Sequence, residues 1–188
     1  MARRMDDWDF KMMAPPPLKR HRGTGGNLFG YFWEYLKGKP CKIYSEVPVL
    51  ITEELRNKFK EEYEKETGVP FPKKYFIPDL AVICNPEIDK DNHVEGAPDI
   101  IIEILSKKTM RIDRGIKKEI YAEMGVKEYW VVDPAGEWIE IFDLEKNISE
   151  VYSDDREEND EGEFDGEEPT VSPLKFPELK IKINDIFR

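Results

Sequence analysis

Two short apolar runs, each carrying a carboxylate, constrain the fold of this chain more than any other feature. The first run is PDLAVI at 78–83 and the second is PDIIIEILS at 98–106. Side chains alternate along a strand, so Glu103 shares one face of the second run with Asp99 and Leu105, while isoleucines fill the other. A strand that is apolar on both faces is covered on both sides. These runs therefore predict two buried strands of a central sheet.

The remaining elements follow from apolar spacing and from capping residues. Helices are predicted over 21–37, 53–67 and 111–124, with Gly38, Gly68 and Gly125 as stops. Single strands are predicted over 42–51, 78–84, 99–106 and 128–133. A hairpin is predicted from strands at 138–144 and 150–153, and a final strand near the C-terminus at 179–183. Residues 1–20, which include three consecutive prolines, are interpreted as a mobile N-terminal arm. Residues 21–188 are then long enough for a single domain with a sizeable core.

The charge of the chain is unevenly distributed. The net charge is −11, which speaks against a broad nucleic-acid-binding surface. Residues 153–168, however, hold ten acids and one arginine, so the rest of the chain is nearly balanced. This acidic stretch is predicted to be a solvated loop. A nearly balanced body can present a local basic groove, or merely a solvated helix face, built from Lys107, Lys108, Arg111, Arg114, Lys117 and Lys118.

Several classes of protein are not expected from the sequence. No apolar run approaches the roughly 18 residues of a membrane span, and the basic N-terminus has no apolar segment typical of a secretory signal. The two cysteines, Cys41 and Cys84, are not expected to form a disulfide framework, which favours a reducing cytoplasm. With His21 and His93 they also lack the close cysteine pairing that structural zinc sites use.

The two buried acids are candidates for a metal site. A lone buried carboxylate costs several kcal/mol unless a cation or a metal meets it, so Glu103 requires a partner. A structural salt bridge would satisfy it equally well. Asp79 opens the neighbouring run and could instead only cap a strand end after proline. Because adjacent strands lie about 4.8 Å apart, both acids could reach one ion.

The helix predicted over 111–124 adds a third charged group. At about 100° per residue from Ile112, Asp113 falls at about 100° and Lys117 at about 140°, both inside the apolar half of the helix. One interpretation is a helix-face salt bridge between these two residues, which are four apart. The other is that Lys117 points toward Glu103 and Asp79.

The motif that joins these residues resembles a known family. From Pro78 to Pro134 the pattern PDLAV, PDIIIEILS and RIDRGIKKEIYAEMGVKEYWVVDP is similar to the Uma2 family of restriction-endonuclease-like proteins, also called DUF820. The resemblance extends over most of residues 21–188. It implies the PD-(D/E)xK nuclease fold, an α/β fold with helices flanking a central mixed sheet, here with an extra C-terminal β-hairpin region. Tyr121 and Trp130 match family positions and are expected to pack in the core.

The resemblance also implies roles for the charged residues. Asp79 corresponds to the first acid and Glu103 to the second, and together they would hold Mg²⁺ or Mn²⁺. The general motif asks for lysine at position 105, where this chain has leucine. In this family the lysine is expected on the helix, and Lys117 matches that position. Asp113 matches a further family position and would orient Lys117 or line the site.

The leading hypothesis is therefore a Mg²⁺-dependent endonuclease that hydrolyses DNA phosphodiester bonds, with catalytic residues Asp79, Glu103, Lys117 and Asp113. A homodimer fits this hypothesis, because cutting both strands usually takes two sites. The first alternative is a non-catalytic nucleic-acid-binding module on a nuclease fold, favoured by the displaced lysine and the acidic composition. The second is a protein-interaction domain that uses residues 153–168 as its contact.

Overall fold

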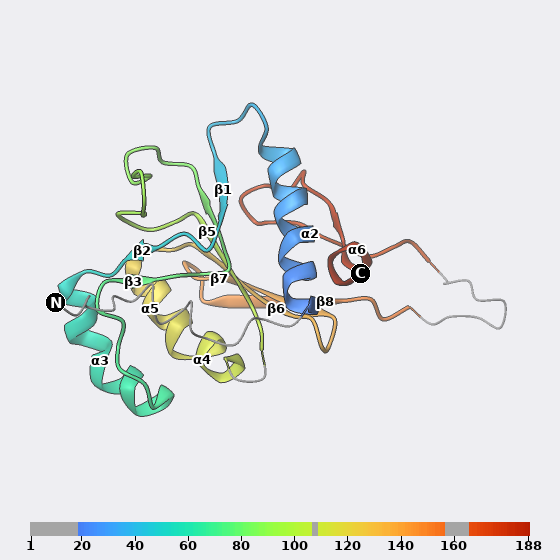
Figure 1. The fold of residues 1–188 in the computed structure, drawn as a ribbon. Helices are drawn as coiled ribbons and strands as arrows, with labels where there is room; N and C mark the ends of the chain where they lie inside the picture. Colours follow the sequence, from blue (N-terminus) through green and yellow to red (C-terminus); the bar gives the residue numbers. More distant parts are fainter. Residues whose placement is uncertain (1–18, 107–108, 157–165) are drawn as a thin grey trace.

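A six-stranded mixed sheet forms the centre of the protein (Figure 1). The computed structural model describes residues 19–106, 109–156 and 166–188. The strands are β1 (Lys42–Ser45), β4 (Leu80–Ile83), β5 (Ile100–Ile104), β6 (Glu128–Asp133), β7 (Trp138–Asp143) and β8 (Ile148–Ser153). They lie in the order β1-β4-β5-β6-β7-β8, with β5 and β6 parallel and every other neighbouring pair antiparallel. The predicted central sheet and the hairpin of β7 and β8 are confirmed.

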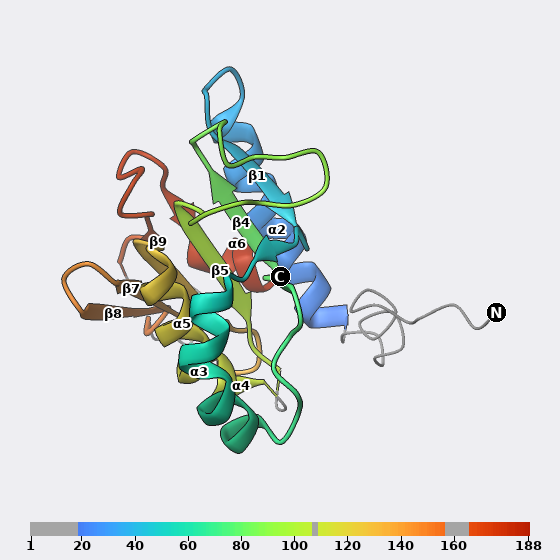
Figure 2. The same cartoon turned by 90° about the vertical axis from the view of Figure 1, so that its left-hand side faces the viewer.

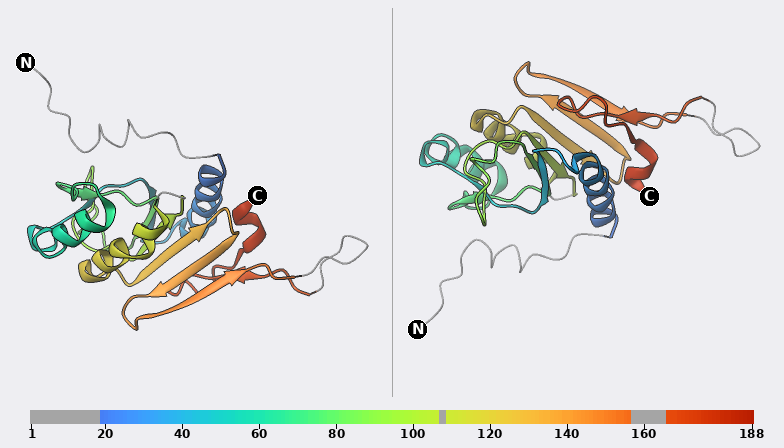
Figure 3. Two further views of the ribbon diagram at one scale, coloured as in Figure 1. Left: turned by 90° about the horizontal axis from the view of Figure 1, so that it is seen from below. Right: turned by 90° about the horizontal axis from the view of Figure 1, so that it is seen from above.

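Helices cover both faces of this sheet. The helices are α2 (Lys19–Leu36), α3 (Glu53–Thr67), α4 (Met110–Arg114), α5 (Ile116–Met124) and α6 (Ile183–Phe187). Figures 2 and 3 show α2 with α6 on one side and α3, α4 and α5 on the other. One apolar cluster joins α2 and α6 to the sheet, and a second joins α3 and α5 to its opposite face. All residues of β4 and β5 are buried, as expected for apolar strands between two helical layers.

The connection between β5 and β6 brings the predicted site helix over the sheet. Parallel strands need a long crossover, and here α4 and α5 provide it. The prediction of one continuous helix over 111–124 is wrong. Gly115 separates α4 from α5 with φ −105° and ψ −113°, outside helical geometry, and a Cβ there would lie 2.9 Å from the backbone oxygen of Arg111. The break therefore requires glycine.

The other elements are short. Two small sheets pair β2 (Val49–Leu50) with β3 (Tyr75–Phe76) and β9 (Thr170–Val171) with β10 (Ile181–Lys182). The strand predicted at 179–183 is limited to β10, and the chain continues into α6. The reason is that Ile183, Ile186 and Phe187 have helical spacing and bury this face in the cluster beneath α2.

The boundaries of the longer helices follow the predicted signals. Thr52 caps α3, its hydroxyl accepting the N–H of Leu55, and Gly68 ends the helix in the left-handed conformation. Helix α2 begins at Lys19, two residues before its predicted start. The first eighteen residues of the predicted arm and residues 157–165 of the acidic stretch lie outside the described residues. Within residues 19–106, 109–156 and 166–188, none of the helices has the length and apolar composition to cross a membrane.

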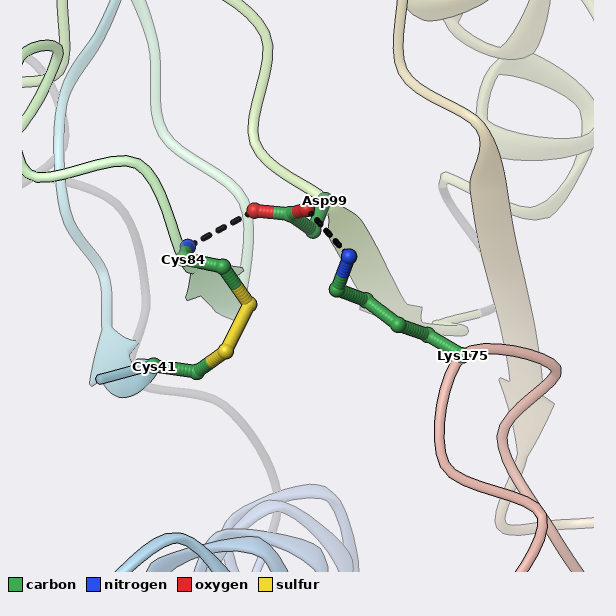
Figure 4. The surroundings of a disulfide bond; sticks show 4 residues. All are labelled: Cys41, Cys84, Asp99 and Lys175. Atoms are coloured by element: carbon green, nitrogen blue, oxygen red, sulfur yellow. Dashed lines mark hydrogen bonds and ion pairs between the residues drawn. A yellow bond between two sulfur atoms is a disulfide. The ribbon is translucent and has the colours of Figure 1, made fainter. Parts of the chain in front are cut away.

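The two cysteines are joined, contrary to the prediction. Lys42 pairs with Ile83 in the antiparallel ladder of β1 and β4, so the next position places Cys41 opposite Cys84. Their Cα atoms lie 3.9 Å apart and their sulfur atoms form a disulfide (Figure 4). The pairing was hidden because the two residues are 43 positions apart and meet only when the edge strand pairs. Neither cysteine is free, so the two cysteines do not indicate a reducing compartment.

Candidate active site

The two candidate carboxylates lie on neighbouring strands at the same level of the sheet. In the antiparallel ladder of β4 and β5, Leu80 pairs with Ile102, and one step further Asp79 stands opposite Glu103. Residues directly opposite in such a pair are close neighbours. The apolar stretches on either side form the ladder itself, so the register is fixed by burial on both faces. The strand pairing therefore brings these two positions together.

Glu103 is buried and holds two polar partners. Its side chain is 5% exposed, and its Oε1 atom lies 2.6 Å from Nζ of Lys117. The hydroxyl of Tyr121 donates to the same oxygen at 3.2 Å. Burial raises the pKa of Glu103 to about 8, although the charge of Lys117 opposes the shift, and the negative charges of Asp113 and Asp79 add to it. Glu103 is thus a carboxyl group whose protonation is sensitive to its immediate partners.

Lys117 connects two acids from different elements. Its Nζ lies 2.8 Å from Oδ1 of Asp113, in addition to its contact with Glu103. Burial opposes the charge of Lys117, but the two carboxylates raise its pKa well above the usual value. Asp113 stands on α4 and Lys117 on α5, so the glycine break between the helices lies inside the site. The helix pair with Asp113 forms, and Lys117 also contacts Glu103, as the second interpretation predicted. Among the described residues, Lys117 forms no ion pair with Asp79, which that interpretation also included.

Asp79 is anchored by the backbone of the neighbouring strand. Its Oδ2 atom accepts the N–H of Ile104 at 2.8 Å. The same oxygen lies 3.6 Å from Nε2 of His21, which stands near the start of α2. Asp79 keeps 21% of its side chain exposed, in contrast to Glu103. The more open carboxylate of the pair is therefore the one fixed by a backbone bond.

Three residues around the acids were not identified as site residues from the sequence. Tyr121 is fully buried, as predicted for a core residue, and its hydroxyl also donates a hydrogen bond to Glu103. Tyr129 similarly donates to the backbone oxygen of Asp113 at 2.8 Å. His21 lies one helical turn before Thr24 and two before Leu28, both buried on the sheet side of α2. That spacing is the signal that could have placed His21 against the sheet.

The basic residues of the predicted groove separate into different environments. Lys117 is buried in the site, and Lys107 and Lys108 lie outside the described residues. Arg114 is bound to Glu140 at 2.6 Å, and Nζ of Lys118 lies 4.6 Å from the ring centre of Phe142. The exposed half of Arg114 and the neighbouring Lys118 still carry positive charge beside the crossover helices.

The donor set suits a hard cation held partly by water. Among the described residues, no three His, Cys, Asp or Glu side chains converge closely enough to form an all-protein cage. Magnesium does not require one, because it usually takes one or two carboxylates and keeps several waters. Both bonds that Glu103 accepts from described residues go to Oε1, so Oε2 receives none from them. Asp79 and Glu103 therefore fit a cation of this kind.

Comparison with a solved structure supports the fold. The chain is similar to the structure titled "Crystal structure of a putative nuclease belonging to DUF820 from Anabaena variabilis ATCC 29413 at 1.96 A resolution". The TM-score is 0.62, the sequence identity is 18%, and the alignment covers 92% of this chain and 83% of that one. At this identity the likeness shows the fold alone, and it confirms the predicted nuclease-like architecture. No curated protein matches the chain.

A family model extends the comparison to the sequence. The model described as "Uma2: Putative restriction endonuclease" matches residues 6–175. This range contains both apolar runs, the crossover helices and the β7–β8 hairpin. The match covers most of the chain and confirms the resemblance inferred from the motif. The chain belongs to the Uma2 family.

Proposed function

We propose that the chain is a metal-dependent endonuclease that hydrolyses phosphodiester bonds in DNA. The observation that carries the proposal is the pairing of Asp79 with Glu103 across β4 and β5, beside the buried amine of Lys117. Membership in a family described as a restriction endonuclease agrees with it. A phosphodiester carries negative charge that increases during hydrolysis, so cationic groups fixed near the reacting phosphate accelerate the reaction.

Asp79 and Glu103 are proposed to hold Mg²⁺ or Mn²⁺. When bound, such an ion neutralises phosphate charge and makes a water molecule more acidic. The backbone N–H of Ile104 keeps one oxygen of Asp79 in place, while its partly exposed carboxylate remains accessible. Tyr121 orients Glu103 through the bond to Oε1. Each acid thus has a partner that fixes its direction.

Lys117 is proposed to stabilise the developing charge on the phosphate. It lies between Glu103 and Asp113, and both acids keep it protonated. A lysine held charged in a buried site loses little to solvent when it meets a phosphate oxygen. Asp113 positions the amine from α4. This arrangement places on a helix the charge that the general motif places at position 105, which is leucine here.

Plasmid cleavage with matched lysine variants tests the proposal. In Mn²⁺ or Mg²⁺, Lys117→Ala should reduce the cleavage rate by about 100-fold or more, the scale of one lost electrostatic stabiliser. Lys118→Ala, one residue further along α5, removes the same charge outside the acid cluster and should change the rate less than about threefold. Melting temperatures of both variants must be measured, because Lys117→Ala leaves two buried acids without their cation.

Two further variants separate lost chemistry from lost folding. Lys117→Arg keeps the charge and the ion pairs, so it should retain the fold but place the cation differently. Glu103→Gln keeps the shape of the side chain and removes one ligand charge, and should abolish cleavage with little loss of stability. Equal cleavage by wild type and Lys117→Ala would refute the role of this lysine.

A second function has support from one specific observation. Glu103, Lys117 and Asp113 form a salt-bridge network among themselves. Such a network could be structural, leaving a nucleic-acid-binding module that does not cut. Absence of cleavage by the wild type across metals and substrates, together with salt-sensitive DNA binding, would favour this alternative.

A further inference from the structure

We propose that Arg20 and Arg22 on helix α2 bind backbone phosphates of DNA beside the two site carboxylates. The inference rests on the proposed function and adds to it the surface that holds the substrate. DNA is a polyanion and the chain has a net charge of −11, so binding requires a local group of cations. Helix α2 supplies such a group, because Lys19, Arg20 and Arg22 are all exposed.

Both arginines lie beside the proposed metal site. Nε2 of His21 lies 3.6 Å from Oδ2 of Asp79, so this part of α2 stands next to the more open of the two carboxylates. Successive residues of an α-helix are about 100° apart, which places Arg20 and Arg22 on either side of the imidazole. The two guanidinium groups therefore border the place where the reacting phosphate would lie.

Close packing holds this part of α2 against the end of β5. A Cβ on Gly25 would lie 3.0 Å from Cδ1 of Ile104, closer than the roughly 4 Å of an ordinary apolar contact. Glycine therefore lets the helix backbone approach the strand. The N–H of Ile104 also binds Oδ2 of Asp79. The same strand residue thus contacts the helix and orients the carboxylate, which fixes the arginines relative to the site.

The charges of α2 are arranged against its helix dipole. Acidic residues near the start of a helix and basic residues near its end are stabilising. In α2, however, three of the first four residues are Lys or Arg, the first turn holds no acid and the last turn holds no basic residue. Helix stability does not account for this arrangement, whereas a bound anion does.

One carboxylate of the protein competes for Arg20. Its Nη2 atom lies 2.8 Å from Oε1 of Glu137, in the turn between β6 and β7. The two side chains are 58% and 53% exposed, and exposed ion pairs of this kind contribute little to stability. A DNA phosphate can therefore replace the carboxylate, because guanidinium binds phosphate through two parallel N–H bonds.

The surface fits an extended polyanion better than a single phosphate. Figure 2 shows α2 on one side of β5 and α4 on the other. Arg111 on α4 is exposed as well. Exposed cations therefore lie on both sides of the strand that carries Glu103. A nucleic-acid backbone is long enough to contact both groups, whereas one phosphate is not.

DNA binding by matched double variants tests the inference. Arg20→Gln/Arg22→Gln is compared with Lys37→Gln/Lys39→Gln, which removes the same charge just beyond the other end of α2. Binding of duplex DNA is measured over a salt series in EDTA, so that metal chemistry does not contribute. The arginine variant should lose affinity on the order of 10-fold at low salt, and its salt slope should fall by about 1.8, for two lost phosphate contacts. The lysine variant should stay within about twofold of wild type.

Two further measurements separate binding from folding and from chemistry. The arginine variant should melt at or above the wild-type temperature, because it removes basic charge from the start of a helix. In single-turnover cleavage, its rate at saturating protein should stay within about threefold of wild type, while half-saturation should require more protein. A clear fall in melting temperature would assign the arginines to the fold and overturn the inference.

The outcomes for the binding surface and for the nuclease are distinguishable. Wild-type affinity and slope in the arginine variant, or equal losses in both double variants, would overturn the inference. Plasmid cleavage by wild type would then still support the nuclease. A wild type that cuts no DNA, but loses affinity only in the arginine variant, would support the surface and the binding-module alternative. A wild type that binds no DNA at any salt concentration would overturn the inference.

Discussion

The three central strands β4, β5 and β6 carry acids at both ends, and the acids at the two ends are bound in different ways. At the site end, Glu103 is held by the side chains of Lys117 and Tyr121. At the distal end, the buried Glu128 of β6 accepts three N–H bonds, from Trp130 Nε1 and from the backbone of Leu174 and Lys175, at 2.7–3.1 Å. Burial raises the pKa of both glutamates. The two glutamates differ in the groups that compensate for the burial of their carboxylates.

The distal end is fixed mostly through the main chain. There Asp99 accepts the N–H of Cys84 and pairs with Lys175, beside the disulfide to Cys41 (Figure 4). Backbone donors cannot leave without moving the chain. The partners of Glu103, in contrast, can turn away by rotation of side chains alone. The proposed metal site therefore lies where a carboxylate is held by side chains, whereas the acids at the distal end are held mostly by the main chain.

Removing the distal acid should produce the largest effect on stability. Glu128→Ala leaves the buried indole N–H of Trp130 and two partly buried backbone N–H groups without their acceptor. An unsatisfied buried donor costs about 1–3 kcal/mol and the partly buried ones cost less, so the free energy of unfolding should fall by about 3 kcal/mol. Glu145→Ala removes an exposed glutamate and should stay within about 0.5 kcal/mol of wild type. Urea denaturation of the two variants measures the contrast. Equal stability of the two variants would mean that the hydrogen bonds to Glu128 do not stabilise the fold.

Opening the disulfide should have the next largest effect. The double variant Cys41→Ala, Cys84→Ala should lower the free energy of unfolding by about 2–4 kcal/mol, because the bond closes a long loop of the unfolded chain. Mn²⁺ binding should be unchanged, since the bond lies at the end of β4 away from Asp79. Thermal melts and metal titration check both parts. Loss of metal binding in a folded double variant would show that the two ends are coupled.

The pH dependence of stability should distinguish Glu103 from a neutral replacement. Its folded pKa of about 8 lies above the ordinary value of 4.5, so the native state holds this proton more tightly than the unfolded state. The stability contributed by this proton is fully present below pH 4.5, the pKa of the unfolded state. It is lost as the pH rises through about 8, the pKa of the folded state. The slope is at most about 1.4 kcal/mol per pH unit.

Glu103→Gln provides the comparison, because glutamine does not titrate. Unfolding free energies of wild type and variant are measured from pH 5 to about 8.5 without divalent ions, a range set by the shift itself. The wild type should lose stability relative to the variant across this range. A constant difference would show that Glu103 stays ionised throughout, held by Lys117 alone.

The acidic stretch should give the smallest effect. Residues 157–165 contain six acids, and replacing these acids with glutamine or asparagine keeps the length while removing repulsion toward DNA. The DNA affinity of the neutral variant should be a few-fold higher than that of wild type at low salt. The two affinities should become equal at high salt, because salt screens the long-range repulsion between the acids and DNA. Filter binding over a salt series tests this. Weaker binding by the neutral variant would indicate that the stretch contributes contacts of its own.

The sequence by itself determined the buried strands, the long helices and the acids at the site end. Alternation along β5 placed Glu103 in a core where it needed a cation, and helical spacing pointed Lys117 toward it. These are local patterns, because the period of a strand or helix is set by backbone geometry. Gly115 was different: its backbone angles break the helix without disturbing the apolar spacing around it.

Only the tertiary structure decided which distant residues meet. Cys41 and Cys84 bond because the edge strand pairs in one register, and His21 reaches Asp79 because α2 packs across the sheet from the site helix. Likewise, Glu128 is satisfied by backbone donors that come from 46 and 47 residues along the chain. Such contacts depend on packing between elements, and the local periodicity of the sequence does not predict them. The sequence thus predicted that Glu103 required a partner, whereas the packing of the helices against the sheet determined which groups surround it.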